Sequence, residues 1–554
     1  MAIRFLLALT VAVSLDAPAS KPLSPADKLI GQALAGSACM TGEGAGSLSA
    51  SGKTVLIKGL TPAHMPVSSD AEAQAFFDQG LGLLFGFDFD EAQKSFRRAA
   101  EIDAMCTMCG WGEALAIGPY INSGPVAAKH IAEGRALVAR VLADTRLSPR
   151  DRALAEALHA RYAPGGTQNG AHADLYADML VKLSARFPDD NLVAIMAAEA
   201  IMSAQPWDYW QAGGKVPKGR IGEALALVET VLARAPDDPQ AIHLLIHLTE
   251  ASAHPERAAG PAARLENIAP AAPHMVHMPS HTWYRIGRFD DAIAANRRAI
   301  SADEAYARSI GADPVNYGYF NHHSHFIVSA ATQIEDRITA LAAAAGLEKA
   351  LAANDLASSP RLEMRLITAL HARTHFLSPA EVLALPAADK RLLRMQMAWR
   401  GVRAEAMALA GDTNGARAEL IALRNARDAI PRATAGDMAF AAIADSVARG
   451  RIAEAEGDSS QALRQYRAAE AIESNLAYAE PPLWPTPISV LSGQLRLRLG
   501  DKAGAAADFR RALAERPGNR LASTGLASTG LALAASQFGT VGATRTGSTY
   551  VSSQ

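Results

Sequence analysis

Cysteine is scarce in this 554-residue sequence, which has only Cys39, Cys106 and Cys109, too few for a disulfide framework. A charge excess is also missing, because 54 lysines and arginines nearly balance 56 aspartates and glutamates. A net charge of −2 gives no reason to expect nucleic acid or an anionic membrane surface as a partner. Long apolar runs are absent too: no stretch reaches about 18 uninterrupted apolar residues, so no transmembrane segment is expected.

Motifs that would identify an activity are incomplete or missing. The segment SLSASGKT has Ser47 where a phosphate-binding loop needs glycine, so nucleotide binding is not expected. Cys106 and Cys109 form one CxxC, but Gly110 follows instead of a histidine, which excludes c-type haem attachment. A lone CxxC is a weak zinc signal, and we interpret the pair as thiols packed at a helix junction. No HExxH zinc motif is present.

Both ends of the chain differ from its middle. Residues 1–19 carry Arg4, an apolar run and a small-x-small site at Ala17 to Ala19, which predicts a signal peptide and export to the periplasm or beyond. Residues 20–68 are rich in glycine, serine and proline and predict loop or weak structure. Residues 531–554 predict a disordered tail.

The middle of the chain repeats with a period of 34 residues. Ala224, Ala258 and Ala292 are 34 apart, and Pro236 and Pro270 keep the same step. A small residue in the second helix followed by a proline turn resembles the tetratricopeptide (TPR) repeat, a helix-turn-helix unit. We therefore expect an all-α, TPR-like α-solenoid with N-terminal helices over 69–204, a histidine-rich core over 205–380 and further repeats over 381–530.

Histidines recur at this period. His243 and His247 are followed 34 residues later by His277 and His281, and residues four apart on a helix share one face. In a TPR array both pairs would face the concave groove, and His274, His322 and His325 extend the pattern. Pro279 is an obstacle, because a helix that begins there would leave His274 and His277 on the approach loop.

A bound metal would explain why so many imidazoles gather. Imidazole suits copper, zinc, iron and nickel, whereas hard cations prefer oxygen. Two copper ions with three histidines each, or one zinc or copper ion with an open position, both fit the pattern. Glu250 or Asp208 would orient a ligand or handle protons. Eight aromatic residues would shape a pocket for a small-molecule or peptide ligand in the groove: Trp207, Tyr209, Trp210, Trp283, Tyr284, Tyr317, Tyr319 and Phe320. The first three lie on one inserted loop, and such aromatic residues equally cap a hydrophobic layer.

Several segments are similar to a bacterial, often exported, family of TPR-containing proteins whose hallmark is an HMPSH stretch. They include CGWGEALAIGP, PWDYW, HLTEASAHPERA, HMPSHTWYRIGRFDDAIAANRRAI, HHSHF and EPPLWPTP. The resemblance covers about 70–530 and implies the architecture and the importance of the histidines. It implies no reaction.

Two classes of function follow from these patterns. The first is an exported metalloenzyme, with oxidative copper chemistry favoured over zinc hydrolysis because the cluster is rich in histidine and poor in carboxylate; metal storage differs from it only in turnover. The second is a TPR scaffold that binds a protein or peptide without catalysis. Peptide-binding grooves usually present lysine, arginine and asparagine, whereas histidine and glutamate are expected here.

Overall fold

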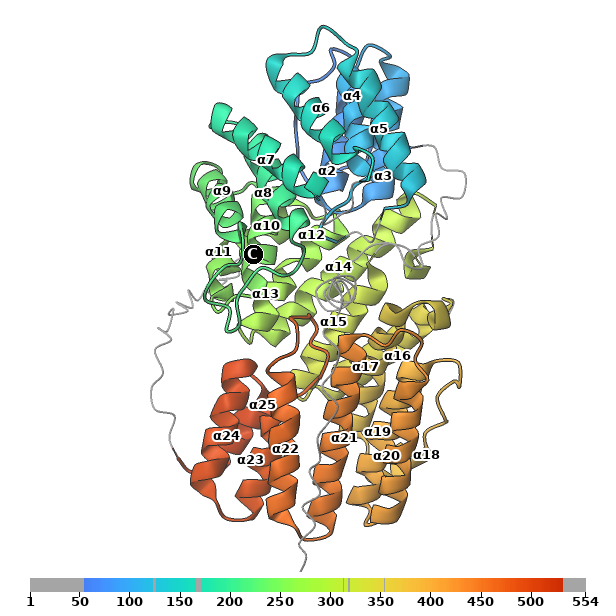
Figure 1. Ribbon diagram of the computed structural model, residues 1–554, viewed down its shortest axis with the longest axis vertical. Helices are drawn as coiled ribbons and strands as arrows, with labels where there is room; N and C mark the ends of the chain where they lie inside the picture. The colour runs from blue at the N-terminus through green and yellow to red at the C-terminus, as the bar shows by residue number, and fades with distance from the viewer. Residues whose placement is uncertain are drawn as a thin grey trace, which may run out of the picture.

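The computed structural model describes residues 54–122, 126–165, 171–311, 313–316, 319–352 and 354–531. The predicted signal peptide, most of the 20–68 segment and residues 532–554 lie outside this part. Every regular element in the described ranges is helical, apart from one isolated bridge between Trp210 and Pro217. The predicted all-α, TPR-like solenoid is confirmed (Figure 1).

The N-terminal helices and the histidine-rich core follow one another as α2 (Ala71–Phe85), α3 (Phe89–Ile102), α4 (Thr107–Ala116), α5 (Ala128–Leu142), α6 (Pro149–Arg161), α7 (Ala171–Arg186), α8 (Asn191–Ala204), α9 (Ile221–Arg234), α10 (Pro239–Glu250), η1 (Pro255–Ala258), α11 (Ala259–Ile268), α12 (Pro273–His277), α13 (Pro279–Arg285), α14 (Phe289–Ser309), η2 (Pro314–Asn316), α15 (Phe320–Gln333) and α16 (Arg337–Leu351). The C-terminal part consists of η3 (Leu356–Ser358), α17 (Pro360–Phe376), α18 (Pro379–Ala384), α19 (Leu393–Leu409), α20 (Thr413–Asp428), α21 (Ala435–Ala455), α22 (Ser459–Glu473), α23 (Ser489–Arg498), α24 (Lys502–Glu515) and α25 (Arg520–Ser528).

The small residues of the repeat lie where two helices approach most closely. Ala92, Ala224 and Ala292 have no exposed surface. A Cβ added at Gly80 of α2 would lie 2.7 Å from the ring of Phe96 in α3. The small residues that recur every 34 positions therefore mark the close contact between the two helices of each hairpin.

Six hairpins close in the same way. In each, an amide N–H bonds to the carbonyl five residues earlier, and the residue before that amide has a positive φ, as in the Schellman motif. These left-handed residues each stand five positions before the buried alanine of the next helix: Phe87, Gly287, Glu335, Gly411, Gly457 and Gly500. Four are glycine, which adopts positive φ without steric cost. Phe87 and Glu335 are exceptions.

The C-terminal repeats contact the histidine-rich core through the segment between α22 and α23 and through the turn before α25. Gln333 of α15 donates a 2.5 Å hydrogen bond to the carbonyl of Pro485, and Asn519 donates to the Gln333 side chain at 2.9 Å. In Figure 1 the orange and red C-terminal helices lie together below the green and yellow-green core helices. In the described part of the chain, no helix combines the length and apolarity that crossing a membrane requires.

Candidate metal centre

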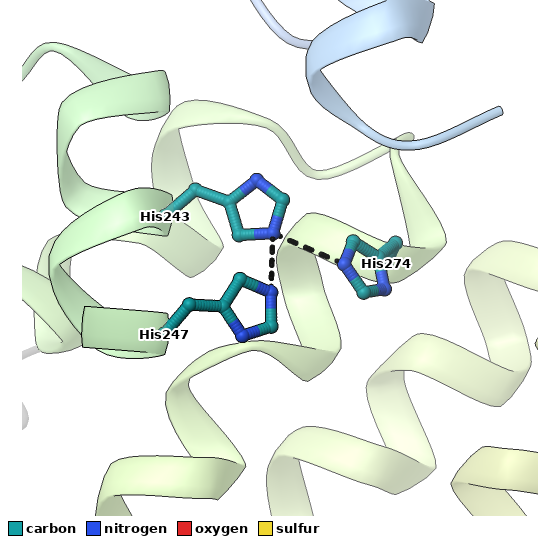
Figure 2. Close-up of side chains that lie close together, drawn as sticks. All are labelled: His243, His247 and His274. Atoms are coloured by element: carbon teal, nitrogen blue, oxygen red, sulfur yellow. Dashed lines mark hydrogen bonds between the residues drawn. The ribbon is translucent and has the colours of Figure 1, made fainter. Parts of the chain in front are cut away.

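Trio one consists of His243, His247 and His274, which meet between α10 and α12 (Figure 2). Asp238 caps the N-terminus of α10 and Pro239 occupies its first turn, so the helix presents His243 and His247 on one face. His243 Nε2 lies 3.1 Å from His247 Nε2 and 3.1 Å from His274 Nε2. Three imidazole nitrogens thus converge on one point.

Trio two consists of His277, His281 and His322. His277 Nε2 lies 2.9 Å from His281 Nε2 and 3.1 Å from His322 Nε2. Pro279 does begin a new helix, but Met278 keeps helical backbone angles between α12 and α13. His274 and His277 consequently stand on a short helix rather than on a loop, and α12 contributes one ring to each trio.

The two trios are adjacent. The ring centroids of His247 and His281 are 5.9 Å apart, and those of His274 and His277 are 6.0 Å apart. All six side chains are at most 2% exposed. Neighbouring elements therefore cover the histidines.

Hydrogen bonds fix the orientation of four of the rings. His243 Nδ1 donates to the carbonyl of Phe85 at 2.9 Å, and His277 Nδ1 donates to Asn296 Oδ1 at 2.7 Å. Glu250 connects the trios: its Oε1 lies 2.8 Å from His247 Nδ1 and its Oε2 lies 2.5 Å from His281 Nδ1. Since a carbonyl or carboxylate oxygen only accepts, these Nδ1 atoms carry the protons.

The same hydrogen bonds leave a lone pair, rather than a proton, on the Nε2 atoms of these four histidines. A neutral imidazole protonated at Nδ1 has a lone pair on Nε2. In both trios such lone pairs face one another at about 3 Å, which is unfavourable unless a cation lies between them. Three nitrogens and a buried acceptor behind the ligand rings are the features of an imidazole metal site.

Burial favours the neutral form of five of the six imidazoles. It lowers the pKa of His243, His274, His277 and His322 well below the ordinary value, and neighbouring histidines add to this. Burial also lowers the pKa of His247, against the opposing effect of Glu250. Neutral imidazole is the form that binds a metal.

A second carboxylate reaches the centre from the C-terminal repeats. Glu480 Oε2 lies 3.4 Å from His281 Nδ1, and the Tyr478 hydroxyl bonds to Glu480 and, at 3.2 Å, to Glu250 Oε2. Burial raises the pKa of Glu480, whereas the pKa of Glu250 is lowered to about 2 because His281 and His247 outweigh its burial. Glu480 was not predicted as a site residue, because nothing in the sequence connects it with His281, about 200 residues earlier.

Aromatic rings surround both trios. The Phe87 centroid lies 4.5 Å from that of His243, and Tyr319 stacks on His274 at 4.5 Å. The Phe326 centroid lies 4.8 Å from those of His277 and His281. Tyr319 was predicted as a pocket aromatic, whereas Phe87 and Phe326 were not predicted as site residues.

The predicted pocket aromatics occupy different places. Trp207 packs edge-on against His247 at 5.3 Å and donates to the carbonyl of Ile121, and Tyr209 is buried beside it. Trp210 donates to the carbonyl of Leu248. Trp283 packs under the guanidinium of Arg288, and the Tyr284 hydroxyl bonds to Ser329. Of the predicted pocket aromatics, Trp207 and Tyr319 contact a trio ring, and Tyr317 lies outside the described residues.

Two predicted site residues lie apart from the centre. The side chain of His325 points to α17, where its Nε2 bonds to Thr368 Oγ1 at 2.9 Å. It stands three positions after His322 on α15, which leaves the two side chains about 60° apart around the helix axis. This offset turns His325 away from trio two. Asp208 pairs with Lys218 and is partly exposed, because both residues belong to the 205–220 loop. Neither placement supports the predicted roles.

The interpretation of Cys106 and Cys109 as packed thiols is wrong, because the two form a buried disulfide at the start of α4. His323, beside trio two, is paired with Asp303 at 2.7 Å and is buried. Its ring centroid lies 4.7 Å from that of His277.

Comparisons with known proteins give no activity. No family model and no curated protein matches the chain. Solved structures with a similar arrangement include the APC/C hetero-tetramer Cut9-Hcn1 (12% identity, 85% of this chain and 79% of that chain, TM-score 0.31) and the human IFIT1 dimer with m7Gppp-AAAA (13%, 84% and 90%, 0.32). Yeast Tom70 is another (9%, 83% and 96%, 0.26). Likeness at these TM-scores carries no argument about the site, and the fold description rests on the helical hairpins of the chain itself.

Proposed function

We propose that this TPR-like solenoid is a metalloprotein that holds two transition-metal ions side by side, one in each histidine trio. One observation carries the proposal: imidazoles whose Nδ1 protons are committed to Phe85, Glu250 and Asn296 direct their Nε2 lone pairs at one another. Two positive ions would turn these repulsive contacts into ligation, and each ion would keep an open position beyond its three nitrogens.

Copper is the ion that we propose, with zinc as the second choice. A first shell made only of imidazole suits copper and zinc and disfavours magnesium, calcium and manganese. Copper would supply one-electron redox chemistry toward dioxygen. The overall reaction would take four electrons and four protons from two molecules of an organic substrate to one dioxygen, giving two waters. Glu250 would orient His247 and His281, and Glu480 with Tyr478 would hold protons beside them.

We also propose that the chain acts outside the cytoplasm. The leader-like residues 1–19 and the resemblance to exported bacterial proteins support this. The Cys106 to Cys109 disulfide supports it as well, because disulfides persist in oxidising compartments.

Metal analysis of the purified, copper-loaded protein tests the proposal. The wild type should hold two ions per chain, and His247→Ala and His281→Ala should each lose at least one. His325→Ala is the matched control, since this buried histidine lies outside both trios, and it should keep both ions. Wild-type protein without bound copper or zinc would refute the metalloprotein, and copper-loaded protein that consumes no oxygen with any phenolic substrate would refute the oxidase.

A docking scaffold is the second candidate, and one cavity favours it. A hollow of about 410 Å³ in the C-terminal repeats is lined by residues that include His371, Val402, Glu405, Arg451 and Trp484. Val402→Arg would fill it. Peptides from an array that bind the wild type and are lost by this variant, at unchanged metal content, would support the scaffold; identical binding patterns would refute it.

A further inference from the structure

The hairpin between α2 and α3 departs from the glycine rule that four of the six equivalent turns follow, as does the turn at Glu335. Its left-handed position is occupied by Phe87, at φ 58°, where Gly287, Gly411, Gly457 and Gly500 stand in equivalent hairpins. A side chain in this conformation clashes with its own backbone, and glycine would relieve the clash. A residue kept there at a cost in stability points to a role for its side chain.

The Phe87 ring lies directly on trio one. It is 1% exposed, and its centroid lies 4.5 Å from that of His243, 5.2 Å from His274 and 5.9 Å from His247, on which it stacks. The backbone of the turn is attached to the same place: His243 donates to the carbonyl of Phe85, and the Tyr319 hydroxyl donates to the carbonyl of Phe87 at 3.3 Å.

A cavity borders Phe87 as well. Its volume is about 20 Å³, room for one water molecule, and its lining includes Phe85, Tyr120, Glu199 and Gln240. Phe87 therefore contacts both this hollow and all three histidines of trio one. Among the described residues, Trp207 at φ 62° is another non-glycine in the left-handed region, and it too packs against trio one.

We propose that Phe87 is the gate of trio one, and that the opened site accepts a planar aromatic ring bearing an oxygen donor in the space that the Phe87 ring fills when closed. The walls of that space are flat rings, those of Phe89 and the three histidines. Behind them, Trp207 packs against His247 and Tyr319 stacks on His274. Faces and edges of aromatic rings select another aromatic ring. The assignment of an oxygen donor rests on the proposed function, because the oxygen would bind the metal ion. The role of Phe87 as a gate does not depend on a metal.

Chemical modification of the metal-free protein tests the gate. Diethyl pyrocarbonate acylates neutral imidazoles, and mass spectrometry locates the modified residues. In Phe87→Gly the histidines of trio one should react at least ten times faster than in the wild type. Glu335→Gly makes the same backbone change in an equivalent hairpin away from both trios, and it should react as the wild type does. Equal rates in Phe87→Gly and the wild type, with both folded by circular dichroism, would overturn the gate.

Ligand binding to the copper-loaded protein tests the aromatic ring. Benzoate and cyclohexanecarboxylate present the same donor on a flat and on a puckered ring. Phe87→Gly should bind benzoate at least ten times more tightly than the wild type does, with a clearly smaller gain for cyclohexanecarboxylate. Equal gains, or no gain, would overturn the assignment of the ligand. A wild type that takes up no copper would refute the proposed function and with it the oxygen donor, while the acylation rates would still decide the gate.

Discussion

Replacing Glu250 by glutamine should separate the two trios. Each carboxylate oxygen of Glu250 accepts a hydrogen bond from an imidazole of a different trio, His247 on one side and His281 on the other. An amide has one oxygen and one NH₂ group, so it can accept from only one of these rings. The other ring must move its proton to Nε2, where the lone pair for the metal would be.

The size of the effect follows from the buried geometry. Glu250 is 1% exposed, so water cannot replace the lost acceptor. Loss of such a supporting partner typically weakens metal binding by about 10-fold to 100-fold, which is about 1.4 to 2.7 kcal/mol. We expect Glu250→Gln to hold one copper ion with nearly wild-type affinity and the second at least 10-fold more weakly.

Competitive titration with a copper chelator measures both affinities. Asp303→Asn is the matched control, because Asp303 is a buried carboxylate that holds His323, which belongs to neither trio. It should keep both affinities. Wild-type affinities for both ions in Glu250→Gln would contradict this prediction. An equal loss of copper affinity in Glu250→Gln and in Asp303→Asn would contradict it as well.

Three further outcomes can be measured. The pKa of His325 is lowered to about 3 by burial and a nearby arginine, so the unfolded chain binds a proton before the folded chain does as the pH falls below about 6.5. Between pH 6.5 and 5, the free energy of unfolding in denaturant melts should therefore fall by about 2 kcal/mol less in His325→Gln than in the wild type. Equal losses in the two proteins would contradict this prediction. Gly450→Ala would place a Cβ 2.3 Å from the Tyr466 ring and should cost about 1 to 3 kcal/mol in urea melts, whereas Gly346→Ala, with nothing within 4 Å, should gain about 0.5 to 1 kcal/mol. Asp208→Asn should leave the copper content unchanged, and a loss would restore this residue to the centre.

The fold could be predicted from the sequence because it is local and periodic. Ala92, Ala224 and Ala292 each mark a close approach of two helices, and the repeat carries this signal over most of the chain. The C-terminal pairs α19 with α20, α21 with α22 and α23 with α24 lie within the range 381–530 for which further repeats were predicted.

For the centre, the sequence indicated mainly the residues that recur with the 34-residue period. His243, His247, His277 and His281 recur at one repeat length, and the structure brings them together with His274 and His322. Phe87 and Glu480 are 100 residues or more from the nearest of these in sequence, and their contacts depend on how distant helices pack. His325 was predicted as a ligand and lies outside the centre, because its position on a helix does not specify which neighbouring helix its side chain contacts. Whether these histidines ligate a metal stays a prediction.

The link from Tyr478 and Glu480 to Glu250 has a consequence for how the molecule is built. These two residues are synthesised long after the histidines, so a fragment that stops before α22 would contain all six rings and still leave the last wall of the centre missing. The histidine-rich repeats alone thus lack part of the wall of the centre. If they were expressed as a separate fragment, the histidines should be more exposed to solvent than they are in the whole chain.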